Sequence, residues 1–218
     1  MTTDVRMIQL LMELRRQGVS DTSVLSALEM TPRAMFVPDI FADRAYDNSA
    51  LPIAGGQTIS QPFVVAFMTA ALEVKENLRV LEVGTGSGYQ TAILSRLAKR
   101  VYTVERIPEL ATAAQECFRR LMLFNIDVRV SDGTRGWPGQ APFDRIIVTA
   151  AARESPPEEL LNQLCIKGLM VIPIDRGGHG QVLVRMKRTA QGFQSTNLLP
   201  VKFVPLLEGV AKSDGEAG

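Results

Sequence analysis

Apolar residues recur at helical spacing through the first segment of the chain, up to about residue 77. A helix is expected before the stop signal of Gly18, with apolar positions at Val5, Ile8, Leu11 and Met12. We expect Asp21 to cap a second helix, which ends before Pro32 because the residue before a proline avoids helical geometry. Pro62 fits the first turn of a third helix that reaches about Leu72.

The middle segment, residues 78–174, alternates short apolar runs with stretches of helical periodicity. The apolar runs predict strands at residues 80–83, 100–104, 128–130, 145–149 and 169–174. Helical stretches lie between them, at residues 89–99, from Pro108 and from Pro157. A strict alternation of strand and helix predicts a parallel sheet with helices on both of its faces.

The last segment loses this alternation. After a turn at residues 177–180, two predicted strands at 181–187 and 198–204 follow with no helix between them, which indicates an antiparallel edge pair. The predicted fold is therefore a Rossmann-like, doubly wound α/β fold with a mostly parallel seven-stranded sheet, an antiparallel C-terminal edge pair and an N-terminal helical extension. We expect one domain overall, with a helical region and loop at 1–77, the α/β core at 78–210 and a disordered tail at 211–218.

Composition and charge exclude several classes of protein. Hydrophobic residues make up 46% and charged residues 22% of the chain, which is a balance typical of globular domains. The net charge of +1 gives no basic excess for nucleic acid. No uncharged apolar run approaches the ~20 residues that span a bilayer, and no secretory signal is apparent. Cys117 and Cys165 form no motif and are expected to be reduced thiols in a cytoplasmic protein, and no metal site is expected.

The sharpest local signal is the glycine-rich stretch Glu82-Val83-Gly84-Thr85-Gly86-Ser87-Gly88, where a predicted strand turns into a helix. Glycines there let a ligand approach the backbone, and the amide groups of the helix face the same place. The spacing G-x-G-x-G differs from the G-x-G-x-x-G of dinucleotide sites. Glu82 would repel a pyrophosphate, whereas the ammonium group of an amino-acid-like ligand would tolerate it.

Two more polar positions follow the next strands. Glu105 ends the second strand, where a carboxylate can accept hydrogen bonds from both hydroxyls of a ribose. Asp132 and Gly133 follow the third strand and can read the edge of an adenine. Three such elements, each at the carboxyl end of a strand, predict a nucleoside-containing ligand at this edge of the sheet.

With these three elements the sequence resembles the class I S-adenosylmethionine-dependent methyltransferases, and within them the protein-L-isoaspartate O-methyltransferase family. The resemblance runs from about Arg33 to Leu207. Besides the glycine loop, it rests on residues 31–38 (TPRAMFVP), 55–62 (GGQTISQP), 131–137 (SDGTRGW), 141–151 (APFDRIIVTAA) and 203–206 (FVPL). Residues 57–62 are the most specific of these stretches.

The resemblance implies a set of site residues. S-adenosylmethionine would be held by Gln57, Thr58, Ile59, Ser60, Glu82, Gly84, Thr85, Gly86, Ser87, Gly88, Glu105, Asp132 and Gly133. The acceptor would lie against Gly56, Thr58, Ser60 and Ala150, and Ser60 matches the catalytic serine of the family. Val65 stands where some members have histidine, and Leu207 where some place a hydroxyl residue, so the roles of those side chains are absent here.

The resemblance also implies a reaction, in which a methyl group passes to the free α-carboxylate of L-isoaspartyl residues in damaged proteins and peptides. A carboxylate with a pKa near ~4 is already an anion at neutral pH and needs no general base. That fits a chain whose only histidine, His179, lies in a glycine-rich turn. Ser60 would orient the carboxylate, although the residues alone favour a helix cap ahead of Pro62.

Three other functions stay open from the residues. A class I methyltransferase could act on a small molecule or on RNA, although the near-neutral charge disfavours RNA. A cofactor-binding regulator without catalysis is a second alternative, and a nicotinamide dehydrogenase is disfavoured by the glycine spacing and by Glu82. We expect a monomer without membrane or nucleic-acid partners. Because Asp-Gly is prone to form isoaspartate, we also expect aged preparations to methylate themselves at Asp214.

Overall fold

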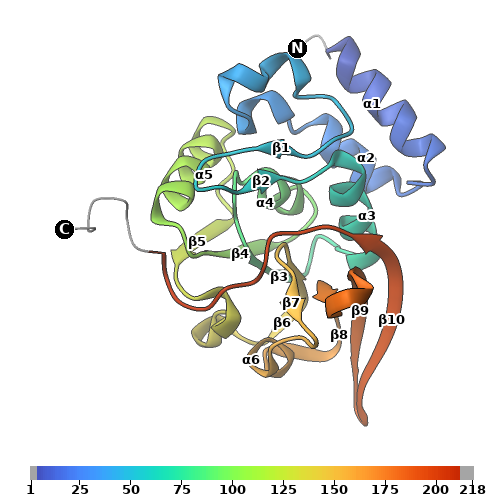
Figure 1. The fold of residues 1–218 in the computed structure, drawn as a ribbon, viewed down its shortest axis with the longest axis vertical. Helices are drawn as coiled ribbons and strands as arrows, with labels where there is room; N and C mark the ends of the chain where they lie inside the picture. Colours follow the sequence, from blue (N-terminus) through green and yellow to red (C-terminus); the bar gives the residue numbers. More distant parts are fainter. Residues whose placement is uncertain (1–3, 212–218) are drawn as a thin grey trace.

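The computed structural model describes residues 4–211 (Figure 1). The expected self-methylation site at Asp214 and nearly all of the expected disordered tail lie outside the described residues. The α-helices are α1 (Val5–Arg16), α2 (Thr22–Glu29), α3 (Pro62–Leu72), α4 (Tyr89–Ser95), α5 (Pro108–Arg120) and α6 (Glu158–Asn162). The 3₁₀ helices are η1 (Arg33–Phe36), η2 (Asp39–Arg44), η3 (Gly133–Arg135), η4 (Pro138–Gln140) and η5 (Gly177–His179). The strands are β1 (Leu51–Pro52), β2 (Thr58–Ile59), β3 (Arg79–Val83), β4 (Arg100–Glu105), β5 (Ile126–Val130), β6 (Phe143–Val148), β7 (Ala152–Arg153), β8 (Leu164–Asp175), β9 (Gln181–Thr189) and β10 (Gly192–Val201).

The main sheet confirms the predicted fold class. Its strands run in the order β10-β9-β8-β6-β3-β4-β5, with β3, β4, β5, β6 and β8 parallel and with β9 and β10 antiparallel. The chain winds outward from β3 through β4 to β5 and then returns to place β6 on the other side of β3. This reversal makes a crevice at the carboxyl ends of β3 and β6, which is where open α/β sheets bind their ligands.

The N-terminal helices form as expected, but α1 buries a different face. Asp4 caps α1 and Asp21 caps α2, each through a side-chain oxygen that accepts a backbone N–H. The buried residues of α1 are Met7, Leu10, Leu11 and Leu14, whereas Val5, Ile8 and Met12 of the expected pattern are exposed. Both sets have helical spacing, so periodicity identified the helix but could not decide which apolar stripe packs on the protein.

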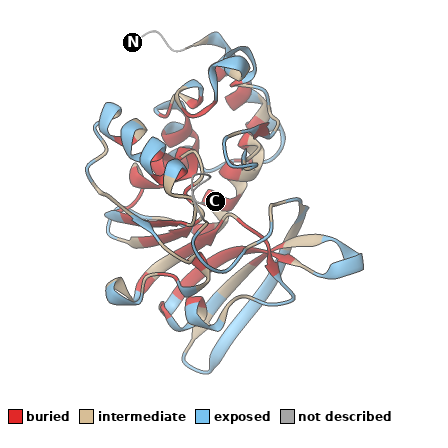
Figure 2. Ribbon diagram, turned by 60° about the vertical axis from the view of Figure 1, so that its left-hand side comes forward, coloured by how far each residue is buried: buried red, intermediate tan, exposed pale blue. Residues whose placement is uncertain are grey.

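The C-terminal strands differ most from expectation. β10 begins six residues before the predicted start at 198 and ends at Val201, because β9 and β10 form a long hairpin whose outer part is polar and exposed (Figure 2). Residues 203–204 leave the strand, and the chain then crosses the sheet edge as a strap over residues 203–211, held by hydrogen bonds between Ala151 and the backbone of Val204 and Leu206. β7, a two-residue strand beside β8, was not predicted, since so short an element has no periodicity to detect.

One apolar core joins the N-terminal helices to the helices that follow the glycine loop. It combines residues such as Leu14 and Leu28 with Ile93 of α4 and Phe118 of α5. At this junction Arg33 is fully buried, with its guanidinium 4.9 Å from the centre of the Tyr89 ring at the start of α4. The N-terminal region is thereby packed against the element that carries the candidate ligand site. Among the helices of residues 4–211, none combines the length and apolarity needed to cross a bilayer.

Candidate functional site

The glycine loop lies at the crevice between β3 and β6 and is held tightly against β6. Gly84 has a φ of +96°, and a Cβ added there would lie 2.2 Å from the Thr149 hydroxyl oxygen. The same hydroxyl donates a hydrogen bond to the Gly84 carbonyl at 2.7 Å. Glycine is therefore required at position 84 both for backbone conformation and for space.

The last glycine of the loop has a different task. Gly88 has a φ of +87°, and a Cβ there would lie 2.7 Å from the Phe118 ring of α5. Gly88 lines none of the described cavities. Its role in this structure is to let the first turn of α4 pack closely against α5, which holds the loop from behind.

Glu105 fixes the glycine loop from the neighbouring strand. One carboxylate oxygen accepts the Gly86 N–H at 2.8 Å and the other accepts the Ile107 N–H at 3.0 Å. The side chain is nearly buried and lines a cavity together with Gly84, Gly86 and Gly133. Each carboxylate oxygen can accept more than one hydrogen bond, so Glu105 keeps acceptor capacity for a ligand in that cavity.

Glu82 lies under the loop rather than at its surface. It is fully buried and accepts hydrogen bonds from the Thr103 hydroxyl at 2.6 Å and from the Thr91 hydroxyl, while its Oε1 has no partner among the described residues. Burial raises the pKa of Glu82 to about 8, against the effect of these two hydroxyls and with a smaller contribution from the charge of Glu105. The reasoning from sequence placed this carboxylate beside the ligand, whereas it lines none of the described cavities.

The third strand end contributes a backbone turn. Asp132 caps η3 and accepts hydrogen bonds from the Thr134 amide at 2.9 Å and hydroxyl at 2.7 Å. Burial alone would raise the pKa of Asp132, but backbone hydrogen bonds from Gly209 and Thr134, together with the Thr134 hydroxyl, outweigh it and hold the pKa below its usual range. Gly133 lines the same cavity as Glu105, and Leu206 of the strap also lines it.

Residues 57–61 form the opposite wall of the crevice. β2 ends at Ile59, and α3 begins at Pro62 with Gln61 at its N-cap and no side-chain cap of its own. The cap comes from Asn48, whose side-chain oxygen accepts the Phe63 N–H at 3.0 Å. The alternative that Ser60 is a helix cap is therefore wrong, and no hydrogen bond to its hydroxyl is recorded within residues 4–211.

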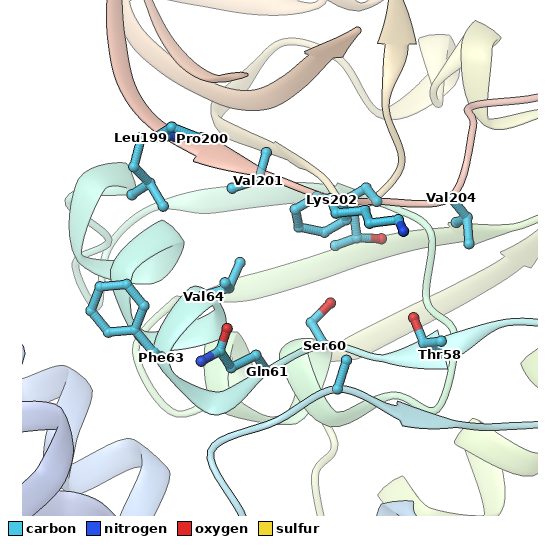
Figure 3. Close-up of a pocket in the computed structure, with 13 residues that line it drawn as sticks. Thr58, Ser60, Gln61, Phe63, Val64, Leu199, Pro200, Val201, Lys202 and Val204 are labelled. Carbon is cyan, nitrogen blue, oxygen red and sulfur yellow. The ribbon is translucent and has the colours of Figure 1, made fainter. Parts of the chain in front are cut away.

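An open cleft of about 720 Å³ lies between this wall and the C-terminal strand and strap (Figure 3). Its lining is mostly apolar and includes Phe63, Leu199, Val201 and Phe203, with the hydroxyls of Thr58, Ser60 and Thr149. Ser60 lines both this cleft and a small niche beside the glycine loop. Thr58 and Thr149 line the cleft, the niche and the cavity beside Glu105, so the three spaces meet at these hydroxyls.

The structure brings most of the expected residues to this junction. The cleft, niche or cavity is lined by Gln57, Thr58, Ile59, Ser60, Gly84, Thr85, Gly86, Ser87, Glu105, Gly133 and Ala150. The expected residues that line none of them are Gly56, Glu82, Gly88 and Asp132. The sequence analysis did not name Thr149 or the strap as parts of the site. Thr149 carries a signal that could have identified it, because it is the last residue of the strand predicted at 145–149 and so lies at the carboxyl end of a parallel strand.

These residues suit the ligand that the resemblance implies. The tight backbone at Gly84, the partly free acceptors of Glu105 and the apolar strap fit an amino-acid end, a ribose and a flat base in that order. They offer no cluster of cations for a phosphate. Within residues 4–211, no group of three or more His, Cys, Asp or Glu side chains is placed to hold a metal ion.

Comparison with known proteins decides the family. A family model described as protein-L-isoaspartate(D-aspartate) O-methyltransferase (PCMT) matches residues 6–211. The chain belongs to this family. PCMT relatives from Rhodospirillum centenum and Paramagnetospirillum magneticum, both protein-L-isoaspartate O-methyltransferases, are 54% and 57% identical to it. Their alignments cover 97% and 94% of this chain and 96% of each relative.

Solved structures agree with this membership. A protein-L-isoaspartate O-methyltransferase superposes with a TM-score of 0.83 at 27% identity, covering 91% of this chain and 65% of the other. A PCMT from Plasmodium falciparum in complex with S-adenosyl-L-homocysteine superposes with a TM-score of 0.79 at 26% identity, covering 91% of this chain and 97% of the other. The cofactor of the PCMT family is thus S-adenosylmethionine, and the chain is a methyltransferase.

Proposed function

We propose that Ser60 and Thr58 hold the acceptor carboxylate at the junction of the cleft and the niche, in the isoaspartyl methyl transfer that the PCMT family carries out. The observation that carries this assignment is the position of Ser60, which lines both spaces and has a hydroxyl with no recorded partner in the described chain. A hydroxyl that is free of other bonds can donate to an incoming carboxylate. Because Asn48 caps α3 in its place, Ser60 has no competing structural duty.

The reaction needs no general acid or base from the protein. When bound, S-adenosylmethionine supplies a methyl group on a sulfonium centre that an oxygen anion can attack directly. The acceptor carboxylate is ionised at neutral pH, so the protein needs no residue to remove a proton. Ser60 and Thr58 therefore act by orienting the acceptor. A peptide that lies against the apolar walls of the cleft displaces water from a step in which two opposite charges disappear.

We assign the cofactor-facing residues by the same geometry. Glu105 accepts the ribose hydroxyls, Gly84 and Gly86 line the space for the amino-acid end, and Gly133 with Leu206 encloses the base. Glu82 has an indirect role: it accepts hydrogen bonds from the Thr91 and Thr103 hydroxyls and so supports the glycine loop above it. Gly88 and Asp132 act through packing and through the η3 turn.

Label transfer from S-adenosylmethionine tests the assignment to Ser60. Two peptides that differ only in Asp versus isoAsp are offered, and we expect a base-labile methyl ester on the isoaspartyl peptide alone. Ser60→Ala should lower kcat by about 10- to 100-fold, because the acceptor carboxylate loses the alignment with the methyl donor that Ser60 provides, and should leave the Kd for S-adenosylhomocysteine within about twofold. Ser155→Ala, which alters an exposed serine that lines none of the described cavities, is the matched control. An unchanged kcat in Ser60→Ala would remove the role, and a base-stable product would favour a different acceptor.

The substrate in this proposal is a damaged protein, and the chain works as a cytoplasmic monomer without nucleic-acid or membrane partners. The near-zero net charge supports a protein acceptor over nucleic acid. Cys117 and Cys165 are free thiols, which supports a reducing compartment. Sedimentation at several protein concentrations tests the monomer, and a mass that rises with concentration would contradict it.

A further inference from the structure

The acceptor cleft contains a cation that the methyl transfer does not use. Of the thirteen residues that line the cleft, Lys202 is the only charged one. Figure 3 shows its ammonium nitrogen in the cleft, across the gap from the hydroxyls of Ser60 and Thr58. No acidic side chain lies within ion-pair distance of Lys202 in residues 4–211. The charge is therefore available to a ligand.

The backbone next to Lys202 is held by hydrogen bonds, so the fold sets the point from which its side chain enters the cleft. The next residue, Phe203, is held by both ends of the Gln181 side chain, which accepts its N–H at 2.7 Å and donates to its carbonyl at 3.1 Å. Val204 then accepts the Ala151 N–H at 2.8 Å. A lysine on such a base can lay its stem along the apolar lining while the ammonium stays in water at the mouth of the cleft.

The reacting carboxylate is a poor partner for this cation. Methyl transfer neutralises that carboxylate, so an ion pair with Lys202 would stabilise the ground state more than the transition state and would slow the reaction. A carboxylate elsewhere on the peptide keeps its charge throughout. Pairing with such a group improves binding of the peptide without opposing the chemical step.

We propose that Lys202 forms a subsite for an Asp or Glu side chain next to the isoaspartyl residue, so that the enzyme favours damage in acidic stretches. This inference rests on the proposed function of the cleft, since it needs a peptide to lie there. Lys202 selects among substrates and takes no part in the transfer itself.

Two isoaspartyl peptides test the subsite: one carries Glu on both sides of the isoaspartate, and its twin carries Gln at both places. The quantity to measure is the ratio of kcat/KM for the Glu peptide to that for the Gln peptide. We expect a ratio above one in the wild type, a fall of about two- to fivefold in Lys202→Gln, and a larger fall of up to about tenfold in Lys202→Glu. The fall in the ratio should come from KM and should become smaller at high salt. Lys202→Arg keeps the positive charge and should keep the wild-type ratio.

A lysine outside the cleft provides the control. Lys187 is exposed on β9, and Lys187→Gln should leave the ratio at its wild-type value. If Lys202→Gln lowers kcat/KM equally for both peptides, Lys202 serves the reacting carboxylate and the subsite is wrong. A ratio that is the same in wild type, Lys202→Gln and Lys202→Glu also overturns it. If the wild type methylates neither peptide, the proposed function is wrong. Calorimetry then measures the Kd of each peptide for the S-adenosylhomocysteine complex, so that a failure of methyl transfer is distinguished from a missing preference for the Glu peptide.

Discussion

The two halves of the candidate site are built in opposite ways. On the cofactor side, Gly84 is pressed against Thr149, Glu105 accepts two backbone N–H groups, and Glu82 is fully buried beneath the loop. On the acceptor side, Thr58 and Lys202 are exposed and the cleft opens to solvent. A tight cradle of glycines and buried polar groups suits a ligand that is always the same.

The open side suits a ligand that varies. A damaged residue occurs in many different sequences, so walls that contact every peptide closely would exclude most substrates. Hydroxyls and one cation at the rim of an apolar cleft allow recognition without close packing. The comparison therefore predicts that substitutions on the cofactor side have large, uniform effects, whereas those on the acceptor side have smaller and substrate-dependent ones.

The largest effect is expected from Gly84→Ala. The new methyl group meets the Thr149 hydroxyl at 2.2 Å, and the φ of +96° is one that alanine rarely adopts. We expect the Kd for S-adenosylhomocysteine to rise by about 100-fold, measured by calorimetry on protein whose circular dichroism is unchanged. Gly139→Ala is the control, because a Cβ at that position meets nothing within 4 Å. Near-normal binding by Gly84→Ala would show that the loop is not a tight cradle.

A somewhat smaller effect is expected at Glu82, and it depends on pH. Burial raises the pKa of Glu82 from 4.5 to about 8, so the native protein holds a proton that the unfolded chain has already lost in that range. The free energy of unfolding should therefore fall as the pH rises from about 4.5 toward about 8. Glu82→Gln removes this ionisation. From pH 4.5 to pH 8 the free energy of unfolding of the variant should therefore rise relative to that of the wild type, by about 2–4 kcal/mol.

Urea unfolding at both ends of this pH range measures that difference. Glu116→Gln, a change at a half-exposed carboxylate on α5, is the matched control and should follow the wild type. If Glu82→Gln shows the same pH dependence as the wild type, the buried carboxyl is not the group that titrates.

The contrast between the two halves also explains what could be predicted from the sequence. The glycine loop and Glu105 are local signals, since each directly follows a predicted strand and parallel strands bring their carboxyl ends together. The sheet and its antiparallel edge pair followed from periodicity in the same way. The stretch at residues 57–62 was found only through a family resemblance, because nothing in its own periodicity indicates the wall of a cleft.

What could not be predicted depends on tertiary contacts. Glu82 is buried between α4 and β4, where it accepts hydrogen bonds from Thr91 and Thr103. No local pattern in the sequence indicates that these two hydroxyls meet its carboxylate. Residues 203–204, where the strap begins, belong to the strand predicted at 198–204, because every residue of that stretch except Lys202 is apolar and the pattern does not tell pairing from crossing the sheet. Lys202 belongs to no sequence motif. Its proposed role depends on the fold, which places it across the cleft from Ser60 (Figure 3).

The smallest effect is expected at Asn48, which links the acceptor wall to α1. Its amide donates to Glu13 at 2.8 Å and to Gln17 at 3.2 Å, while its oxygen caps α3 through the Phe63 N–H. Asn48→Ala removes the cap and should cost about 1 kcal/mol, or a fall in Tm of about 2–4 °C. Asn48→Asp keeps the cap but loses both donors, and it is made together with Glu13→Gln so that two carboxylates do not face each other at 2.8 Å; Glu13→Gln alone is its reference.

If positioning of the Ser60 wall depends on the cap, kcat should fall a few-fold in Asn48→Ala and recover in Asn48→Asp, with the Kd for S-adenosylhomocysteine unchanged in both. A fall of kcat in both variants would instead assign the positioning to the contacts with Glu13 and Gln17. A parallel loss of cofactor binding would contradict the separation of the two halves, because the side-chain hydrogen bonds of Asn48 within residues 4–211 join α1 to the start of α3 and reach no residue of the cofactor side.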